Sequence, residues 1–271
     1  MPELPEVETT VRGLAPVLAG RRIAAIEARR LDLRRPFPVD LRKRMTGATV
    51  TALGRRAKYG LIETDRGDTL VFHLGMSGSW RLDPVALGPH DHLVIETDEG
   101  RRLSLHDPRR FGSVDLVRTD RIGETAPFAD MGLEPLGAGF GGAYLKRALE
   151  GRSAGIKTLL LDQRLVAGLG NIYVCEALNL AAIAPGRAGG GLSRARLDRL
   201  AEAVKSVLRD AIEAGGSSLR DYLQPNGELG YFASQWRVYG REGKPCPRCA
   251  APIRRRVEGG RSTFYCGKCQ R

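Results

Sequence analysis

The first hydrophobic pattern in the chain has helical spacing. From Pro5 onward, apolar residues recur three or four positions apart, at Val7, Val11, Leu14, Val17 and Leu18. Proline is tolerated in the first turn of a helix, where its missing N–H has no intrahelical partner. The pattern therefore predicts an amphipathic helix that begins near Pro5.

Two pairs of apolar runs then predict β-hairpins. Residues 61–64 and 69–74 flank the turn Asp65-Arg66-Gly67-Asp68, and residues 92–97 and 102–105 flank Asp98-Glu99-Gly100. We expect residues 1–120 to form a β-sandwich domain with a leading helix.

The helical period returns after a linker over residues 121–142. Its clearest face is followed by Gly215-Gly216 and preceded by the glycine-rich loop 188–193. That face consists of Leu197, Leu200, Val204, Leu208, Ala211 and Ile212. The prediction is an α+β multidomain protein with a helical domain over 143–235 and a small last domain over 236–271.

The last domain carries four cysteines with the spacing of a zinc site. Cys246 and Cys249 form one pair and Cys266 and Cys269 form a second, with sixteen residues between the pairs. The alternative, two disulfides, requires an oxidising compartment. Four thiolates close the coordination sphere, so we expect one structural Zn²⁺ and no catalytic metal. The fifth cysteine, Cys175, lies in an apolar helical stretch and is interpreted as a core residue.

The charge of the chain points to a polyanionic partner. Lysine and arginine number 43 against 31 acidic residues, which gives a formal charge of +12. A membrane surface is the alternative, but no apolar run approaches ~20 residues and the N-terminus is acidic, unlike a signal peptide. The expectation is a cytoplasmic protein.

The N-terminus itself carries candidate chemistry. If Met1 is removed, Pro2 presents a secondary amine beside Glu3 and near Glu6. A free α-amino group titrates about two units below a lysine ammonium, so more of it is neutral and nucleophilic at physiological pH. The alternative is an ordinary solvated helix start.

Six separated motifs and the cysteine pattern occur together in one order along the chain. The motifs are Pro2-Glu-Leu-Pro-Glu-Val-Glu, Arg55-Arg-Ala-Lys-Tyr-Gly, His73-Leu-Gly-Met-Ser-Gly, His90-Asp-His, Asp107-Pro-Arg-Arg-Phe-Gly and Gly168-Leu-Gly-Asn-Ile-Tyr. Together they resemble the bacterial formamidopyrimidine-DNA glycosylases over essentially the whole chain. Related enzymes that act on oxidised pyrimidines differ by a glycine where this chain has Leu4.

The resemblance implies a bifunctional DNA glycosylase and abasic-site lyase of base excision repair that removes 8-oxoguanine and formamidopyrimidines. Pro2 would form the Schiff base, and Glu3 would transfer protons with support from Glu6. Lys58 would contact the lesion-side phosphate, and Arg261 would bind a phosphate and assist δ-elimination. No redox cofactor is implied.

The resemblance also assigns the DNA contacts. Met76 and Phe111 would enter the space left by the extruded base, and Arg109 would bond the widowed cytosine. Without the motifs, both apolar residues could equally belong to a core. Phosphate contacts would come from His90, Arg152, Lys157 and Asn171, the last in the hairpin of a helix-two-turn-helix element. Pro89 stands where the family often has a basic residue, so one contact is expected to be missing.

The expected partner is damaged double-stranded DNA, bound by a monomer associated with the nucleoid and with no membrane. A loop over residues 215–222 matches the family segment that closes over an extruded purine. A noncatalytic zinc-ribbon DNA-binding protein would explain the charge and the cysteines, but not Pro2, Glu3 and Lys58. A free N-terminal proline in the mature protein discriminates between the two.

Overall fold

The computed structural model describes residues 2–217 and 223–271. The chain forms two compact units, Met1–Ala129 with Ile212–Ala233 and Asp130–Ala211 with Ser234–Arg271. The expected loop over residues 215–222 lies largely outside the described residues. The domain boundaries expected from the sequence remain a prediction.

The leading helix, α1, spans Leu4–Leu18, as the apolar spacing predicts. Glu3 is its N-cap, and Glu3 and Glu6 form a capping box in which each side chain accepts a backbone N–H of the other residue. The apolar face at Val7, Leu14 and Leu18 is buried. The polar groups at the helix start are thus fixed by the same turn that fixes the helix.

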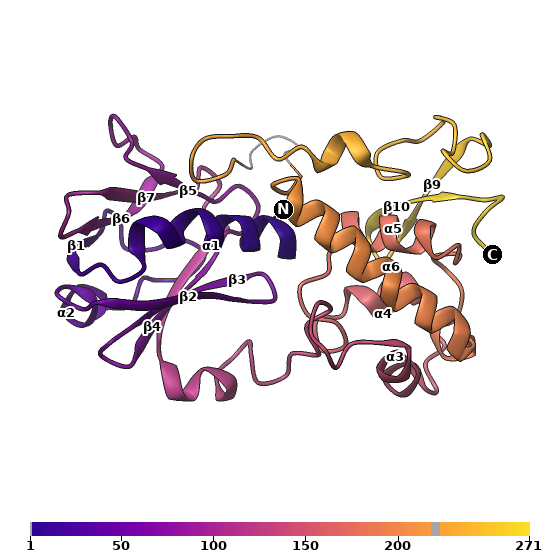
Figure 1. Ribbon diagram of the computed structural model, residues 1–271, viewed down its shortest axis with the longest axis horizontal. Helices are drawn as coiled ribbons and strands as arrows, with labels where there is room; N and C mark the ends of the chain where they lie inside the picture. Colours follow the sequence, from indigo (N-terminus) through magenta and orange to yellow (C-terminus); the bar gives the residue numbers. More distant parts are fainter. Residues whose placement is uncertain (1, 218–222) are drawn as a thin grey trace. The chain divides into compact units, whose positions relative to one another are not determined.

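Two antiparallel four-stranded sheets make up the first unit, and both predicted hairpins are confirmed. One sheet has the order β1 (Ile23–Ala28), β6 (Asp91–Thr97), β7 (Arg102–His106) and β5 (Ser79–Leu82). The other has the order β2 (Val50–Arg56), β3 (Tyr59–Thr64), β4 (Asp68–His73) and β8 (Ser113–Arg118). Helix α1 contacts β2, β3 and β5, so it packs on both sheets (Figure 1).

The core of this unit combines residues from α1 and from both sheets. The fully buried aromatic rings of Phe72 on β4 and Trp80 on β5 pack edge to face, 5.5 Å between centroids. Gly60 makes room for this packing, because a Cβ there would lie 2.0 Å from the Phe72 ring. The first unit is therefore a β-sandwich with a leading helix, as predicted.

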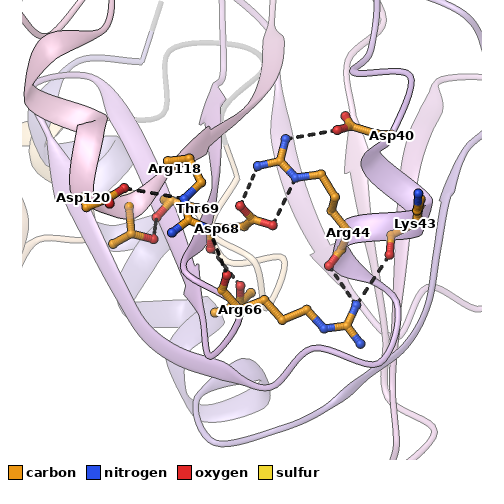
Figure 2. A network of polar contacts seen from close by, with 10 residues as sticks. Asp40, Lys43, Arg44, Arg66, Asp68, Thr69, Arg118 and Asp120 are labelled. Atoms are coloured by element: carbon orange, nitrogen blue, oxygen red, sulfur yellow. Dashed lines mark hydrogen bonds and ion pairs between the residues drawn. The ribbon is translucent and has the colours of Figure 1, made fainter.

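A polar network joins α2 (Leu41–Met45) to the β3–β4 turn and to the 3₁₀ helix η1 (Thr119–Glu124) (Figure 2). The Arg44 guanidinium donates to Asp68 at 3.0 Å and to Asp40 at 3.1 Å. The hydrogen bond from Arg44 lowers the pKa of Asp68 below its ordinary value. Arg66 donates to the backbone oxygen of Arg44, and Arg118 donates to that of Arg66. This network holds together the turns at one end of the second sheet.

The second unit contains the helices and the cysteine hairpin. Its helices are α3 (Gly142–Leu149), α4 (Ile156–Leu161), α5 (Asn171–Leu180) and most of α6 (Arg194–Glu213). It also contains the short 3₁₀ helix η2 (Gly189–Gly191) and the end of η3 (Phe232–Gln235), which begins in the first unit. Strands β9 (Ile253–Glu258) and β10 (Arg261–Cys266) form the hairpin. Gly259 and Gly260 both have positive φ at its tip, a conformation that glycine adopts without steric cost. No helix in residues 2–217 and 223–271 is long and apolar enough to cross a membrane.

Candidate functional site

The start of α1 buries the candidate catalytic residues. Pro2 is buried, and Glu3 and Glu6 are 3% and 2% exposed. The Glu6 carboxylate accepts the backbone N–H of Glu3 at 2.8 Å and, through its other oxygen, the backbone N–H of Ser217 at 2.8 Å. Glu6 therefore fixes the backbone next to Pro2 and ties it to the segment that follows α6.

Lys58 lies in the tight turn between β2 and β3. Arg56 pairs with Tyr59, so Ala57 and Lys58 alone form the turn, and Ala57 has a φ of +53°. A left-handed conformation costs a residue with a side chain about 1–2 kcal/mol. The Arg55 guanidinium donates to the Ala57 carbonyl at 2.9 Å and to Glu8 of α1 at 3.0 Å. A strained turn thus holds Lys58, which is only 8% exposed, and the bond from Arg55 to Glu8 ties this turn to the helix that follows Pro2 and Glu3.

His73 lies beside Lys58, a place in the site that sequence reasoning missed, although the residue belongs to the motif His73-Leu-Gly-Met-Ser-Gly. Its ring lies 4.7 Å from that of Tyr59, with which it pairs across β3 and β4. Burial and then the positive charge of Lys58 lower the pKa of His73 to about 4, so the imidazole is neutral at physiological pH. Its Nδ1 accepts the N–H of Gly75 at 3.0 Å, which places the hydrogen on Nε2.

Asp107 joins the two loops that carry Met76, Arg109 and Phe111. Its carboxylate accepts the Ser77 hydroxyl at 2.6 Å and the Gly112 N–H at 2.8 Å. A Cβ on Gly75 would lie 2.3 Å from the Phe111 backbone, so glycine is required for the loops to approach. The loops are held against each other by backbone packing and by one buried carboxylate.

The three side chains project from these loops. Met76 and Phe111 are 39% and 44% exposed, and the Arg109 guanidinium lies 5.1 Å from the centre of the Phe111 ring. The alternative that Met76 and Phe111 are core residues is therefore wrong. The structure presents two apolar side chains and one cation together on the surface of the first unit.

In the second unit, α5 holds the cysteine hairpin next to Arg261. Asn171, the first residue of α5, donates from Nδ2 to the Ser262 carbonyl at 2.9 Å. Its Oδ1 is buried and makes no hydrogen bond within the described part of the chain. Arg261 begins β10 and is exposed, as is Arg152, which lies beyond the end of α3. Asn171 and Arg261 are thus neighbours in the structure through Ser262.

Lys157 requires a correction. The family resemblance implies a phosphate contact for this residue, but its side chain is 0% exposed. Its ammonium group donates to the Thr263 hydroxyl at 2.7 Å and to the Ser262 carbonyl at 3.4 Å, and burial lowers its pKa. Helix α4 places this lysine beneath the hairpin, where a phosphate cannot reach it without rearrangement.

The four hairpin cysteines form a site that fits zinc. Their sulfur atoms all lie within 4.8 Å of one another, and none forms a disulfide. Cys246, Cys249, Cys266 and Cys269 can supply the four thiolate ligands of a closed tetrahedral site. The disulfide alternative is wrong, and the site holds one structural zinc ion. Cys175 packs in the same small core with Val238 and Phe264, as expected of a core residue.

Sequence reasoning missed Glu176, which organises the start of the last segment. Its carboxylate is 1% exposed and accepts the backbone N–H groups of Arg237, Val238 and Tyr239 at 2.8, 3.0 and 2.8 Å. Burial raises its pKa. The only signal in the sequence is one acidic residue within an apolar helical run.

Family models match most of the chain. The formamidopyrimidine-DNA glycosylase N-terminal domain matches residues 1–114, the H2TH domain of the same enzymes matches residues 131–222, and the zinc finger found in FPG and IleRS matches residues 243–271. Formamidopyrimidine-DNA glycosylases of Rhizorhabdus wittichii and Zymomonas mobilis are 69% and 51% identical to this chain over the full length of both partners.

Solved structures agree with these matches. The MutM (FPG) protein of Thermus thermophilus is 41% identical with a TM-score of 0.89, and the match covers 99% of this chain and 98% of the other. Lactococcus lactis Fpg in complex with an N7-benzyl-Fapy-dG containing DNA is 36% identical with a TM-score of 0.91, and the match covers 99% of both chains. The chain belongs to the formamidopyrimidine-DNA glycosylase family and is a DNA glycosylase of base excision repair.

Proposed function

We propose that this protein removes oxidised purines from double-stranded DNA through a Schiff base on Pro2 and then cleaves the strand at the abasic site. The observation that carries the proposal is the buried start of α1. There, Pro2 and Glu3 precede the helix, and Glu6 fixes the Glu3 backbone at 2.8 Å. The relatives' names and the Fapy-dG complex of Lactococcus lactis Fpg support the substrate class.

The chemistry uses one amine for two tasks. With Met1 removed, the Pro2 nitrogen attacks C1′ of the damaged nucleotide, the bond from C1′ to the base breaks, and the base leaves with a proton. Opening of the sugar ring gives an iminium ion, which acidifies the C2′ proton. Loss of that proton breaks the C3′–O bond and releases the downstream strand through its phosphate. Loss of the C4′ proton in a second elimination then breaks the C5′–O bond and releases the phosphate of the upstream strand. Hydrolysis of the iminium then restores the amine.

Glu3 is positioned for the proton transfers, since it lies next to Pro2 and is nearly inaccessible to solvent. Glu6 acts as a positioning residue through its bonds to the Glu3 and Ser217 backbone. Lys58, held in its strained turn, supplies the positive charge for the lesion-side phosphate. The neutral His73 beside it offers an uncharged Nε2–H.

Opening the duplex costs a few kcal/mol, which side chains inserted into the vacated space offset. Met76 and Phe111 are exposed on joined loops and suit this role, and Arg109 suits the widowed base. His90, Arg152, Asn171 and Arg261 are assigned to the DNA backbone. Zinc takes no part in the reaction and maintains the hairpin that carries Arg261.

We further propose the domain limits 1–120, 121–142, 143–235 and 236–271, a monomeric protein, and action at the nucleoid, where the substrate is found. The monomer suits a base-extruding enzyme whose assigned residues all come from one chain.

A panel of duplexes tests the proposed function. The protein is incubated with 8-oxoguanine, formamidopyrimidine, oxidised pyrimidine and undamaged duplexes, and both base release and strand cleavage are measured. We expect release and cleavage on the two oxidised purines. Binding without release on any of them would instead support the noncatalytic zinc-ribbon alternative.

Arg109→Ala should flatten the preference for cytosine opposite the lesion. The O2 and N3 atoms of cytosine accept hydrogen bonds from a guanidinium, whereas adenine offers a poorer match. A good bidentate contact discriminates by about 1–3 kcal/mol, which is roughly tenfold to hundredfold. The measurement is the ratio of kcat/KM on 8-oxoguanine opposite cytosine and opposite adenine.

Arg110→Ala is the matched control, since Arg110 is the adjacent exposed arginine. It should lower binding slightly and leave the ratio unchanged. Arg109→Ala should still cleave a duplex that already contains an abasic site. An unchanged ratio in Arg109→Ala would show that another residue reads the widowed base.

Lys157→Met should slow strand cleavage because it disturbs the hairpin of β9 and β10, and not because a contact from Lys157 to a phosphate is lost. Removal of a phosphate contact lowers the slope of log K against log salt by about 0.9. We expect instead the same defect and the same salt slope in Lys157→Met and in Thr263→Val, which removes no charge, because the two residues share one hydrogen bond of 2.7 Å.

The double variant completes this test. If Lys157 acts through Thr263, the double variant should be no worse than Lys157→Met alone, since the two substitutions remove one interaction. Additive defects, with a salt slope that is lower in Lys157→Met than in Thr263→Val, would return Lys157 to the DNA contacts.

A further inference from the structure

His106 ends strand β7 on the outward face of its sheet. In the strand register it pairs with Asp91 of β6 and with Ser79 of β5. The preceding residue, Leu105, is 1% exposed in the core, whereas the His106 side chain is 29% exposed. The alternation of side chains along a strand therefore turns this imidazole away from the core.

Asp91 provides a fixed anion beneath the imidazole. Its side chain is fully buried and accepts the Gly88 N–H at 2.7 Å, the Ser104 hydroxyl at 2.9 Å and Arg81 at 3.2 Å. Burial raises the pKa of Asp91, but the bonds from Gly88 and Ser104 and the charge of Arg81 outweigh it, so the pKa lies below its ordinary value. Asp91 is therefore a carboxylate at physiological pH.

This carboxylate orients the ring of His106. Nδ1 lies 3.3 Å from Asp91 Oδ1, and because an ionised carboxylate only accepts, Nδ1 must carry a hydrogen. No group within residues 2–217 and 223–271 hydrogen-bonds to Nε2. When the imidazole is protonated, Nε2 becomes a charged donor without a partner in the protein.

The surroundings of His106 face the proposed DNA contacts. Its ring lies 5.9 Å from that of the exposed His90, at an interplanar angle of 79°. The next residue, Asp107, joins the loops of Met76 and Arg109. A pocket of about 650 Å³ opens beside it, lined by Ser77, Arg81, Pro108 and their neighbours.

We propose that His106 is a further DNA-binding residue, which Asp91 orients so that Nε2–H donates to a backbone phosphate adjacent to the one bound by His90. This rests on the proposed function, because it places His90 on the phosphate backbone. The contact requires the protonated ring, so DNA binding takes up a proton and affinity rises as the pH falls.

Several other groups act on the charge of His106. They are Asp91 on β6, which contacts the ring, Asp107 directly after β7, Arg81 on β5, which contacts Asp91, and the rings of His90 and His92. His92 is buried and its Nε2 pairs with the Asp107 carbonyl at 2.9 Å, so it is not available to DNA. Among the described residues of this cluster, His90 is the other exposed imidazole, and the test must separate the two.

The test measures affinity for a duplex with a tetrahydrofuran abasic-site analogue between pH 5.5 and 8.5. The proteins are the wild type, His106→Asn, His90→Asn, the double variant and Ser104→Ala. His106→Asn should lose roughly tenfold affinity at pH 6 and little at pH 8, as for one charge-assisted hydrogen bond. Its salt slope at pH 6 should fall by about one unit. Ser104→Ala removes another bond to Asp91 and should keep the wild-type pH dependence.

The pH profile distinguishes a DNA contact from a structural role. A uniform loss of affinity at every pH in His106→Asn, with the wild-type salt slope, would overturn the proposal. If that variant does not fold, as judged by urea unfolding, duplexes with single methylphosphonate linkages are used with the wild-type protein. A neutral linkage next to the one that His90 contacts should reduce the pH dependence further. If no linkage position has this effect, the proposal is overturned. The two proposals fail separately. If no lesion base is released, the proposed function is wrong, but the dependence of DNA affinity on pH would be unchanged.

Discussion

A protein that keeps one extra residue before Pro2 should form no borohydride-trapped complex with 8-oxoguanine DNA. The extension converts the secondary amine into an amide, which is not nucleophilic at carbon. Binding should remain within about threefold, because none of the assigned phosphate and base contacts involves Pro2. Gel quantification of the covalent complex and a binding titration on the same duplex provide the two measurements.

Pro2→Gly is a milder version of the same test. Glycine still offers a terminal amine, but it lacks the ring that fixes the backbone, so the amine is poorly oriented toward C1′. Misplacement of a reacting group by about 1 Å can cost a hundredfold in rate, and we expect a loss of that order. Pro5→Ala is the matched control, since Pro5 lies nearby in the first turn of α1 and carries no free amine in the mature chain. Normal trapping by the extended protein would remove Pro2 from the mechanism.

The elements around this site follow from local patterns in the sequence. Periodicity or turn residues within about fifteen positions predict each of these elements: the helix from Leu4, the hairpins at residues 61–73 and 92–106, and the cysteine hairpin. Such signals arise because neighbouring residues must satisfy one local geometry. The order of the strands within the two sheets has no such signal, since it depends on contacts between distant segments.

The same distinction applies within the site. The Glu3–Glu6 capping box is local and is favoured by sequence spacing, but the bond from Ser217 to Glu6 spans 211 positions and leaves no periodic trace. The exposure of Met76 and the burial of Lys157 also depend on tertiary packing, and residue type suggested the opposite for both. Lysine can be buried when its ammonium is bonded, as it is here to Thr263.

Cys249→Ser should abolish stable zinc binding and disorder the hairpin of β9 and β10. The small core beside the cysteines contains few apolar residues, with Val238, Ile253 and Phe264 buried and Tyr239 partly buried against them, which is too few to hold the hairpin by burial alone. Structural zinc contributes about 10–16 kcal/mol of apparent binding free energy in small domains of this kind. The metal therefore supplies most of the stability of this segment.

The loss should extend to DNA binding through Arg261. The hairpin carries this arginine next to Ser262. The side chains of Asn171 and Lys157 both donate hydrogen bonds to the Ser262 carbonyl. Once the hairpin unfolds, the guanidinium is no longer positioned, and loss of one such charged contact alone should cost at least about tenfold in affinity. Base release should persist at protein concentrations that restore binding, because Pro2 and Glu3 belong to the other unit.

Cys175→Ala separates zinc loss from damage to the same core. Cys175 is fully buried in the cluster that contains Cys246 and Cys266, but it is not one of the four clustered sulfurs. This variant should keep one zinc per chain and near wild-type affinity, whereas Cys249→Ser should lose both. Metal content, hydrogen exchange over residues 253–266 and lesion-DNA affinity are measured on each protein. Wild-type exchange protection and affinity in a zinc-free Cys249→Ser protein would show that packing, and not the metal, holds Arg261 in place.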